Sequence, residues 1–353
     1  MAEPPPTPYL RVDLARLRRN VRRTAERAGS ARVALRPHVK THKCLQIARL
    51  QLASGAVGIT VATIAEAELF ARHGCTDVFI AHPLWVDERA AGRLRDLAAV
   101  ATVAIAADSV EGAANAGHLL GGSGVEVLVE VDSGQHRTGC EPADAGAVAV
   151  AAQRSGLPVR GVFTFPGHSY SPDARLSSAR DESSALREAR DAVTACGIEV
   201  RVVSGGSTPS LAASDTEVLT ELRPGVYVFG DAQQWELGAM PREDIALTCR
   251  ATVVSHAGGR LVLDCGSKVL GADRAAYSTG FGRLLDHPDA RITLLSEHLA
   301  VVDLAAAPPP PLGSQLDVVP NHVCNAVNLV DEIWVQEAES LRPWRVSARG
   351  LNA

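Results

Sequence analysis

The feature that most constrains this chain is a repeated alternation of short apolar runs and helical stretches between about residues 30 and 240. Each run is rich in β-branched residues, ends in a polar or glycine-bearing loop, and is followed by a helical pattern. Near-continuous apolar strands that alternate with helices indicate a parallel sheet buried on both faces. The runs lie at residues 33–39, 58–62, 78–81, 100–106, 125–131, 159–165, 200–204 and 225–229. Eight such units are the number that closes a (β/α)8 TIM-type barrel.

A doubly wound open sheet is the alternative architecture for the same alternation. It is disfavoured because no glycine-rich dinucleotide fingerprint follows the first run. The pattern changes after about residue 245, where residues 251–255 and 260–264 flank a four-residue loop and predict a β-hairpin. Further strands are predicted at residues 9–13, 292–295, 300–304 and 316–319. We predict an α/β barrel over residues 20–242 and an antiparallel β-domain from residues 1–19 and 243–353.

Composition excludes several classes of function. Of the 353 residues, 46% are hydrophobic and 21% charged, and the formal net charge is -5, which argues against a nucleic-acid surface. No apolar run reaches the roughly 18 residues that a membrane helix needs. The N-terminal segment shows no signal-peptide pattern, and the seven cysteines have no disulfide-framework spacing. We therefore expect a cytoplasmic protein that acts on a small molecule.

Polar side chains follow the predicted barrel strands at the ends where barrel enzymes carry their chemistry. The first run leads to Lys40, whose amine is costly to bury as an ammonium but forms Schiff bases once desolvated. The alternative is a strand-end lysine that points to solvent. Arg137 follows the fifth run and can donate to an anionic oxygen, unless it is a surface-paired arginine. His168 and Tyr170 follow the sixth and can stack on a planar ring or transfer protons, unless they are structural.

The loop after the seventh run is typical of a phosphate site. It places two glycines and two hydroxyl side chains before a predicted helix, namely Gly205, Gly206, Ser207 and Thr208. Backbone N–H groups in such a loop form an anion-binding nest, at the place where barrels commonly hold phosphate. An ordinary glycine turn with a helix cap is the alternative. A lysine, a phosphate site, an arginine and aromatic residues at one barrel end indicate pyridoxal phosphate bound by Lys40.

A second group of candidate ligands lies in the β-domain. His322 and Cys324 are two residues apart, so on an extended chain their side chains would share a face. Imidazole and thiolate together suit Zn²⁺, and two protein ligands are too few for a structural site. The pair therefore predicts a catalytic metal with open positions for water or a substrate oxygen. The alternative is a buried cysteine beside an unrelated histidine.

Taken together, these residues resemble the fold-type III pyridoxal-phosphate enzymes of the D-threonine aldolase/D-serine dehydratase group, distant relatives of alanine racemase. The resemblance covers nearly the whole chain, and its most specific segments are RPHVKTHK at residues 36–43 and PNHVCN at residues 320–325. It implies an alanine racemase-like fold, a homodimer, and Lys40 as the residue that binds the cofactor covalently. It also implies that Arg137 lies near the ring oxygen, with Tyr170 and Tyr227 near the cofactor. Gly230 departs from the pattern, which has a polar residue before Asp231.

The resemblance also separates two reactions. The resemblance implies that aldolases of the group use His-x-Asp with a harder metal ion, whereas zinc-dependent dehydratases of the group use His-x-Cys. Cys324 therefore favours a dehydratase. We predict elimination from D-serine or D-threonine to a 2-oxo acid and ammonia, with Lys40, Arg137 and His168 as catalytic residues and zinc on the hydroxyl. The alternatives are a metal-dependent aldolase for D-threonine or 3-hydroxy-D-aspartate, a racemase with a second acid/base, and a non-enzymatic pyridoxal-phosphate carrier.

Overall fold

The structure is a computed structural model that describes residues 4–353 and divides into two compact units. The barrel unit comprises residues 25–40, 51–225 and 351–353, and the β unit comprises the chain up to Thr24 together with residues 41–50 and 226–350. This division differs from the predicted one, which had boundaries at residues 19/20 and 242/243 and no crossing near residue 40. Residues 1–3, which the prediction assigns to the β-domain, lie outside the described residues.

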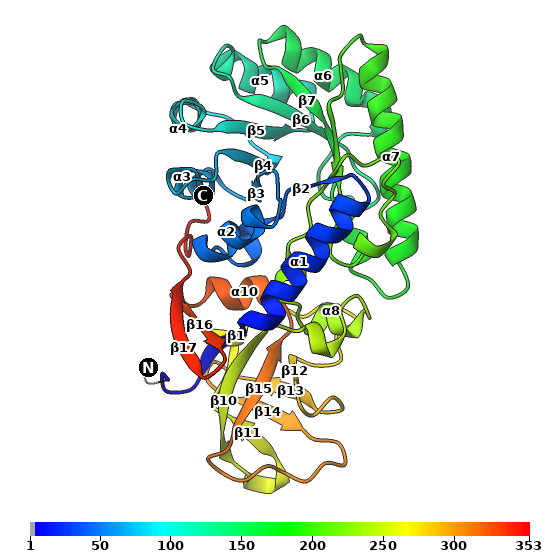
Figure 1. The fold of residues 1–353 in the computed structure, drawn as a ribbon. Coiled ribbons are helices and arrows are strands. Elements are labelled where there is room, and N and C mark those ends of the chain that lie inside the picture. Colours follow the sequence, from blue (N-terminus) through cyan, green and yellow to red (C-terminus); the bar gives the residue numbers. More distant parts are fainter. Residues whose placement is uncertain (1–3) are drawn as a thin grey trace. The chain divides into compact units, whose positions relative to one another are not determined.

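Within residues 4–353, the barrel unit contains an eight-stranded parallel sheet in the order β2-β9-β8-β7-β6-β5-β4-β3 (Figure 1). A parallel bridge between His38 and Thr60 links the two ends of this order, and the Thr60 amide donates to the Pro37 carbonyl. The predicted TIM-like fold class is thereby confirmed. The strands are β2 (Ala34–Leu35), β3 (Ile59–Val61), β4 (Asp77–Pro83), β5 (Thr102–Ala107), β6 (Glu126–Glu130), β7 (Val159–Phe163), β8 (Val202–Gly205) and β9 (Glu221–Leu222).

Five helices connect β3 to β8 in succession, and each contacts the next one along the chain (Figure 1). They are α3 (Ile64–Arg72), α4 (Glu88–Ala98), α5 (Val110–Leu120), α6 (Ala145–Arg154) and α7 (Arg175–Ala195). Three begin at a side-chain cap: Thr63, Asp87 and Ser109 each accept a hydrogen bond from a first-turn amide. Such caps satisfy amides that have no partner within the helix, so the loops end where the sequence supplies these residues.

The eighth predicted strand is wrong. Residues 226–228 form a 3-10 helix, η5 (Val226–Val228), and the last barrel strand is instead the two-residue β9. The ladder with β8 ends where the Arg223 amide donates to the Gly205 carbonyl, because Pro224 has no amide to continue it. The first strand is also shorter than predicted, and Lys40 lies beyond it in a 3-10 turn, η1 (Val39–Thr41).

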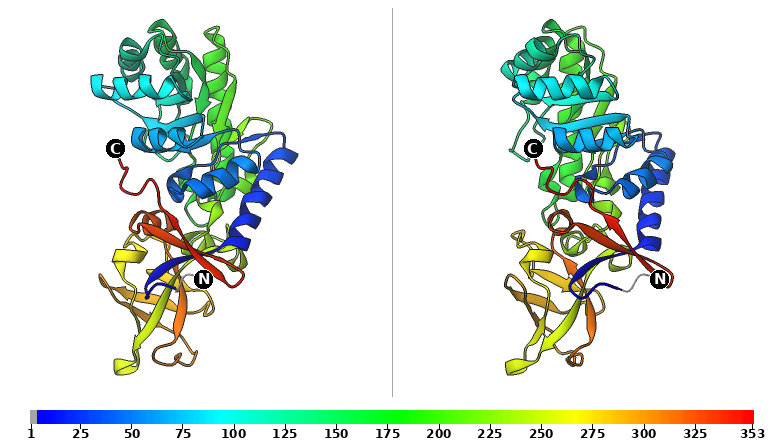
Figure 2. Two further views of the ribbon diagram at one scale, coloured as in Figure 1. Left: turned by 60° about the vertical axis from the view of Figure 1, so that its left-hand side comes forward. Right: turned by 90° about the vertical axis from the view of Figure 1, so that its left-hand side faces the viewer.

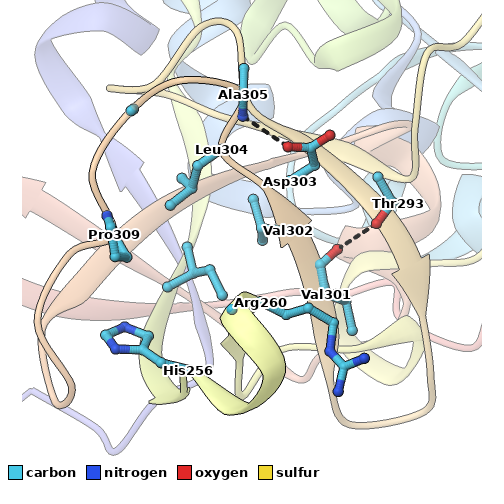
Figure 3. Close-up of a pocket in the computed structure, with 12 residues that line it drawn as sticks. His256, Arg260, Thr293, Val301, Val302, Asp303, Leu304, Ala305 and Pro309 are labelled. Carbon is cyan, nitrogen blue, oxygen red and sulfur yellow. Dashed lines mark hydrogen bonds between the residues drawn. The ribbon is translucent and has the colours of Figure 1, made fainter.

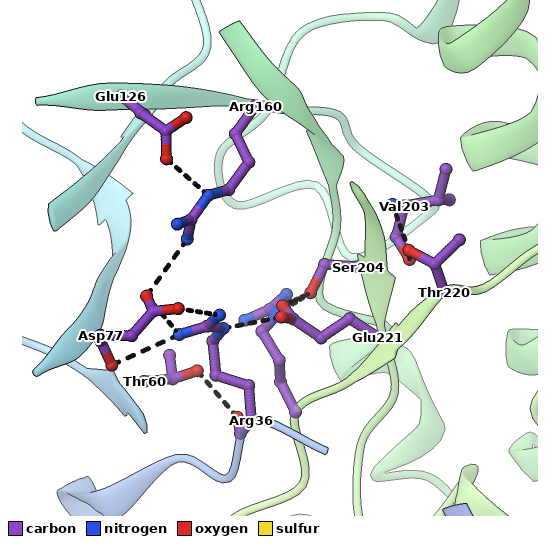
Figure 4. Close-up of polar contacts among 10 residues, drawn as sticks. Arg36, Thr60, Asp77, Glu126, Arg160, Val203, Ser204, Thr220 and Glu221 are labelled. Atoms are coloured by element: carbon purple, nitrogen blue, oxygen red, sulfur yellow. Dashed lines mark hydrogen bonds and ion pairs between the residues drawn. The ribbon is translucent and has the colours of Figure 1, made fainter. Parts of the chain in front are cut away.

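Ion pairs that are buried or partly buried stabilise the amino-terminal end of the barrel (Figure 4). Arg36 donates to Glu221 at 2.7 Å and, through both terminal nitrogens, to Asp77 at 2.8 and 3.0 Å. Arg160 bonds Glu126 at 2.7 Å and Asp77 at 3.3 Å. Asp77 and Glu126 are the first residues of β4 and β6, so this network lies opposite the end that carries Lys40. Pairing offsets the cost of burying these charges, which makes this end structural.

In the described part of the β unit, nine strands form one sheet in the order β11-β14-β13-β12-β15-β10-β1-β16-β17. Figure 2 shows the strands of residues 247–345 in colours from yellow-green to red. The pairings are antiparallel except β1 with β16, and β10 also pairs with β11 as the predicted hairpin. All six predicted strands of this unit are confirmed, whereas β12, β16 and β17 were not predicted. The strands are β1 (Tyr9–Asp13), β10 (Leu247–Ser255), β11 (Leu261–Leu263), β12 (Gly282–Leu284), β13 (Arg291–Leu295), β14 (Ala300–Asp303), β15 (Gln315–Pro320), β16 (Glu332–Glu337) and β17 (Ser340–Arg345).

Helices of the β unit include α8 (Ala232–Glu236), α9 (Ser267–Leu270) and α10 (Val323–Asn328). Two further helices, α1 (Leu14–Ser30) and α2 (Leu45–Ala53), each contribute residues to both units. The core of the β unit takes buried side chains from the sheet, from α10, from Cys44 and Ile47, and from Val226 to Phe229. This packing explains why residues 41–50 and η5 are grouped with the β unit rather than with the barrel.

Candidate functional site

Lys40 lies at the carboxyl-terminal end of the barrel strands, beside the ring of Phe165. The Lys40 Nζ is 5.8 Å from the ring centroid and the Arg137 Cζ is 5.5 Å from it. The ring of Tyr170 is 6.2 Å away at an interplanar angle of 43°. Three of the predicted residues are therefore brought together by one aromatic side chain. The sequence indicated no role for Phe165, because an aromatic residue that follows a strand looks like any other core residue.

The loop that carries Arg137 is fixed by hydrogen bonds to Asp132. Its carboxylate accepts from the Gly134 amide at 2.8 Å, from the His136 amide at 3.1 Å and from the His136 ring at 2.8 Å. Burial acts to raise the pKa of Asp132, but these hydrogen bonds and the His136 charge outweigh it and lower the pKa. The ionised Asp132 thus orders the loop, while Arg137 itself is exposed and accessible to an anion.

His168 is anchored through one ring nitrogen. It lies in a 3-10 turn, η3 (Gly167–Ser169), and its Nε2 is 3.2 Å from the Asp181 carboxylate on α7. Its Nδ1 is buried and has no hydrogen-bond partner within residues 4–353. A Cβ at Gly134 would lie 3.4 Å from the ring, so the glycine leaves space over the imidazole. Nδ1 is therefore the ring atom that no described residue engages, and the catalytic role of His168 stays a prediction.

The predicted phosphate loop follows β8, at the carboxyl-terminal end of the barrel. Gly206 has a φ of +86°, a conformation that favours glycine. Ser207 and Thr208 are buried, and the Ser207 hydroxyl lies 2.8 Å from both the Ser169 and the Ser210 hydroxyls. The loop is therefore preorganised by a hydroxyl cluster that also ties it to η3. The Ser207 amide also donates to the Ser210 hydroxyl at 3.2 Å, so these groups are engaged within the loop, and the phosphate role of residues 205–208 stays a prediction.

A carboxyl group from α7 also contacts this loop. Glu182 is fully buried, and its Oε1 accepts from the Gly206 amide at 2.5 Å. A Cβ at Gly205 would clash with the same oxygen. Burial raises the pKa of Glu182 to about 7, although the Gly206 hydrogen bond and the charge of Arg223 act in the opposite direction. The sequence indicated nothing here, since Glu182 lies in a helical stretch rich in charged residues.

His38 is a second residue that the sequence did not single out. Burial and the positive charges of Lys40, Arg223 and His82 hold the pKa of its imidazole well below the usual range. Its Nδ1 is buried without a hydrogen-bond partner among the described residues. His38 is therefore a neutral ring two residues before Lys40, so it adds no further positive charge beside the amine.

The metal pair does not lie on an extended strand, as the sequence had suggested. His322 is the residue before α10 and Cys324 belongs to that helix, so the pair spans a strand-to-helix turn. The His322 Nδ1 lies 2.7 Å from the Asp273 carboxylate, which leaves Nε2 as the ring nitrogen for a metal. The Cys324 Sγ donates to the Thr41 Oγ1 at 3.4 Å. Imidazole and thiolate are a donor set that fits Zn²⁺.

Negatively charged groups also act on the His322 ring. Burial acts to lower the pKa of His322, but the charge of Cys324 and the hydrogen bonds to Asp273 and Cys324 raise it to about 11. The contact between the ring and the thiol, together with the Asp273 carboxylate, places negative charge around the imidazole. In the part of the chain that the structure describes, no cluster of three or more His, Cys, Asp or Glu side chains is arranged to hold a metal. A metal on His322 and Cys324 would keep open positions.

Asp231 holds the turn between the two ligands. It is fully buried, and its oxygens accept from the Gln234 amide at 2.9 Å and the Val323 amide at 3.1 Å. Burial raises its pKa to about 6. Gly230, the departure from the family pattern, has a φ of +67°, and a Cβ there would lie 2.7 Å from Ile245. The glycine is thus required by backbone conformation and close packing.

Tyr227 is predicted to lie near the cofactor. The structure places it in η5 of the β unit, where it is 3% exposed and belongs to the core cluster. The other predicted cofactor residues belong to the barrel unit. The contact of Tyr227 with the cofactor stays a prediction.

A cavity of about 340 Å³ lies elsewhere in the β unit (Figure 3). It is lined by strands β11, β13 and β14 and by the proline-rich connector, and none of the predicted site residues lines it. Its polar groups are engaged locally: the His256 ring bonds the Pro310 carbonyl, and Asp303 accepts from the Ala305 amide. It shows no convergent set of polar groups for a substrate.

Two further observations concern the whole described chain. Residues 4–353 contain no helix with the length and apolarity needed to cross a membrane. None of the seven cysteines forms a disulfide within the same residues.

Comparisons with known proteins place this chain in a family. Residues 12–233 match the alanine racemase N-terminal domain, and residues 246–336 match the putative serine dehydratase domain. The first match spans more than half of the chain. The chain belongs to the alanine racemase-like, fold-type III pyridoxal-phosphate enzymes.

Full-length relatives of this family member are lyases. The D-threo-3-hydroxyaspartate dehydratase of Delftia sp. (strain HT23) is 36% identical over 348 residues, which cover 90% of each chain. The D-threonine aldolase of Arthrobacter sp. is 33% identical over 364 residues, covering 98% of this chain and 93% of the relative. Dehydratases and aldolases are both lyases, and this chain is a pyridoxal-phosphate-dependent lyase.

Solved structures agree with this placement. A D-threo-3-hydroxyaspartate dehydratase has a TM-score of 0.89 at 31% identity, over 96% of this chain and 94% of that chain. The D-threonine aldolase of Filomicrobium marinum has a TM-score of 0.86 at 31% identity, over 98% and 96%. The dehydratase has been solved as a histidine-to-alanine variant and as a cysteine-to-alanine variant two positions later, the latter in a metal-free form.

Proposed function

We propose that this chain is a metal- and pyridoxal-phosphate-dependent dehydratase of D-3-hydroxy amino acids, which releases a 2-oxo acid and ammonia. The observation that carries the proposal is the His322-x-Cys324 turn. There Asp273 engages the His322 Nδ1 and the ring also bonds the Cys324 side chain, so Nε2 and Sγ would be the two protein ligands of a cation. The dehydratase relative also has a histidine and a cysteine two positions apart, and its cysteine variant is described as metal-free. The relatives are named for D-threo-3-hydroxyaspartate and D-threonine, which supports a D-3-hydroxy substrate.

The barrel residues have defined parts in this proposal. Lys40 would bind the cofactor aldehyde, Tyr170 and Tyr227 would flank the ring, and residues 205–208 would hold the phosphate. When bound, pyridoxal phosphate withdraws electrons from the substrate Cα and so makes its proton acidic. Lys40 would take that proton, and the neutral His38, two residues earlier in the chain, would add no positive charge that opposes the transfer. Arg137, whose guanidinium lies 5.5 Å from the Phe165 ring centroid, would hold an anionic oxygen of the cofactor or the substrate.

The β-unit residues would act on the leaving group. The His322 Nε2 and the Cys324 Sγ would hold a Zn²⁺ ion, which would supply Lewis-acid chemistry at the substrate hydroxyl. Asp273 orients the imidazole, and Asp231 holds the backbone between the two ligands. Thr41, which accepts from the Cys324 thiol, directly follows Lys40 in the chain. His168, with its unengaged Nδ1, is the proposed acid for the departing hydroxyl.

Product analysis tests this function. The purified protein, loaded with pyridoxal phosphate and zinc, is incubated with D-threo-3-hydroxyaspartate, D-threonine and D-serine, and with their L-isomers as controls. Elimination produces ammonia and a 2-oxo acid, which from D-threonine is 2-oxobutanoate. Glycine and an aldehyde would instead identify an aldolase, the reaction for which the Arthrobacter relative is named. Cofactor binding without turnover of any substrate would favour the carrier alternative.

Metal removal tests the role of the β unit separately. A chelator is expected to abolish ammonia release, and added Zn²⁺ is expected to restore it, while the cofactor stays bound. Deamination that persists at full rate in the metal-free protein would contradict the role of His322 and Cys324 in this proposal.

A further inference from the structure

One buried carboxyl group has no part in the proposed reaction, yet it contacts the predicted phosphate loop. Glu182 extends from α7, is 0% exposed, and accepts from the Gly206 amide at 2.5 Å through Oε1. Any side chain at Gly205 would clash with this oxygen. Both glycines of the loop therefore contact or make room for the Glu182 carboxyl group. A glycine turn with a purely structural role would not require a buried carboxyl group beside it.

The second oxygen of the Glu182 carboxyl group lacks a hydrogen bond among the described residues. Its Oε2 is buried and has no hydrogen-bond partner among residues 4–353, and the same holds for the hydroxyl of Ser178, one turn earlier on α7. The positive charge of the buried Arg223 acts to lower the pKa of Glu182. Arg223 directs its donors elsewhere, to the Ser204 hydroxyl at 2.8 Å and the Thr164 carbonyl at 2.5 Å. Further acidic groups act on that guanidinium, namely Glu221 and Glu130.

An ionised carboxylate in this position is unfavourable on two grounds. A buried charge with one unpaired oxygen carries a large desolvation cost, whereas a neutral carboxylic acid carries much less. A phosphate dianion on the neighbouring amides and hydroxyls adds like-charge repulsion, which further disfavours the ionised form. The Gly206 amide can donate to the carbonyl oxygen of the neutral acid, so protonation preserves the hydrogen bond that holds the loop.

We propose that Glu182 is a positioning residue for the cofactor phosphate: it orders the loop through the Gly206 amide, and it takes up a proton from solvent when the phosphate binds. This inference rests on the proposed function, because it takes residues 205–208 as the phosphate site. Without cofactor, the pKa of Glu182 is about 7, so above neutral pH the group is largely ionised and must be protonated on binding. The affinity for pyridoxal phosphate then falls as pH rises above about 7, by up to about tenfold per pH unit.

The experiment compares pyridoxal phosphate with pyridoxal, which lacks the phosphate, on the cofactor-free full-length protein. Dissociation constants are measured at about pH 6 and about pH 8.5 for the wild type and for Glu182→Gln, which keeps an oxygen for the Gly206 amide but carries no charge. Glu188→Gln, an exposed change on the same helix, is the matched control. We expect Glu182→Gln to equal the wild type at the lower pH and to bind pyridoxal phosphate up to about 30-fold more tightly at the higher pH. Pyridoxal affinity is expected to stay the same in all three proteins.

A calorimetric proton count on the wild type needs no variant. At about pH 8 the cofactor phosphate is already a dianion, since its second pKa is near 6. Titration in two buffers of different ionisation enthalpy should show more proton uptake with pyridoxal phosphate than with pyridoxal. Equal uptake, a pH dependence that Glu182→Gln leaves unchanged, or an equal change in pyridoxal affinity would each overturn the inference.

The same data separate this inference from the proposed function. If the wild-type protein binds no pyridoxal phosphate, or binds it equally well after Lys40→Ala, the proposed function fails. If it binds the cofactor through Lys40 but shows no proton coupling, only the role of Glu182 fails.

Discussion

The barrel unit and the β unit assemble their candidate residues in different ways. In the barrel unit, Lys40, Arg137, His168 and residues 205–208 each follow a strand of one parallel sheet, and a regular architecture places such positions at the same end. In the β unit, Thr41, Asp231, Asp273 and the 322–324 turn come from distant segments and meet through specific hydrogen bonds. Site residues on a repeated βα architecture can therefore be predicted from the sequence. Residues that support a site through irregular packing cannot.

The two groups also differ in charge. The barrel residues around Phe165 are cationic, with the Lys40 amine and the Arg137 guanidinium near its ring. The β-unit residues around His322 are acidic, with Asp273 bonded to the ring and the charges of Cys324 and Asp231 acting on it. The first group is suited to an anionic cofactor and the second to a metal cation. Mutations in one unit should therefore affect one cofactor and spare the other.

The largest expected loss of activity comes from a change in the barrel unit. Lys40→Ala should reduce turnover by on the order of 10³-fold or more, because it removes the covalent anchor and the proposed base together. The change is measured as the rate of ammonia release and as loss of the visible absorbance of lysine-bound cofactor. The metal content should stay that of the wild type. Lys268→Ala, an exposed lysine of the β unit, is the control and should be unaffected.

The reciprocal change is Cys324→Ala, with an expected rate loss of on the order of 10²-fold or more, because the metal loses one of two protein ligands. Zinc bound per chain should fall, as measured by elemental analysis, while cofactor absorbance on Lys40 persists. The exposed Cys196→Ala serves as the matched control. If Cys324→Ala removed pyridoxal phosphate as well, the separation of the two groups would be wrong.

Glu182→Gln, a change in the barrel unit, should alter how the free energy of unfolding depends on pH. The pKa of Glu182 rises from an ordinary carboxyl value to about 7 on folding, so the folded state binds more protons between about pH 4.5 and pH 7. The free energy of unfolding of the wild type should decrease across that window, by at most about 3 kcal/mol from this group. Denaturant titrations of Glu182→Gln should lack this component. Parallel pH curves for the two proteins would contradict the buried, unpaired state of Glu182.

The smallest expected effect concerns the support of the metal ligands. Asp273→Ala should weaken zinc affinity by about 10- to 100-fold, because the imidazole loses the partner that fixes its orientation. Competition with a chelator measures this affinity without any assay of activity. Asp273→Asn, which can still accept from the His322 Nδ1, should lose less. Equal zinc affinity in all three proteins would show that Asp273 does not orient the ligand.

The sequence predicted the barrel well because its signal is local. Strands buried on both faces are continuously apolar, and capping residues such as Thr63 and Ser109 mark the helix starts. The exception is the eighth strand, where an apolar run at residues 225–229 follows Pro224 and packs in the core of the β unit instead. An apolar run reports that residues are buried, but it does not report against which neighbours they pack.

The sequence by itself determined the order of strands and helices, the lysine at the carboxyl-terminal end of the barrel, and the His-x-Cys spacing. Only the tertiary structure decided that Phe165 groups Lys40 with Arg137, that Glu182 contacts Gly206, and that Asp273 bonds His322. The physical reason is the sequence separation over which each kind of interaction acts. Periodicity and capping act over a few residues, whereas these contacts join segments 24 to 125 residues apart (206 − 182, 165 − 40) whose approach depends on strand register and packing.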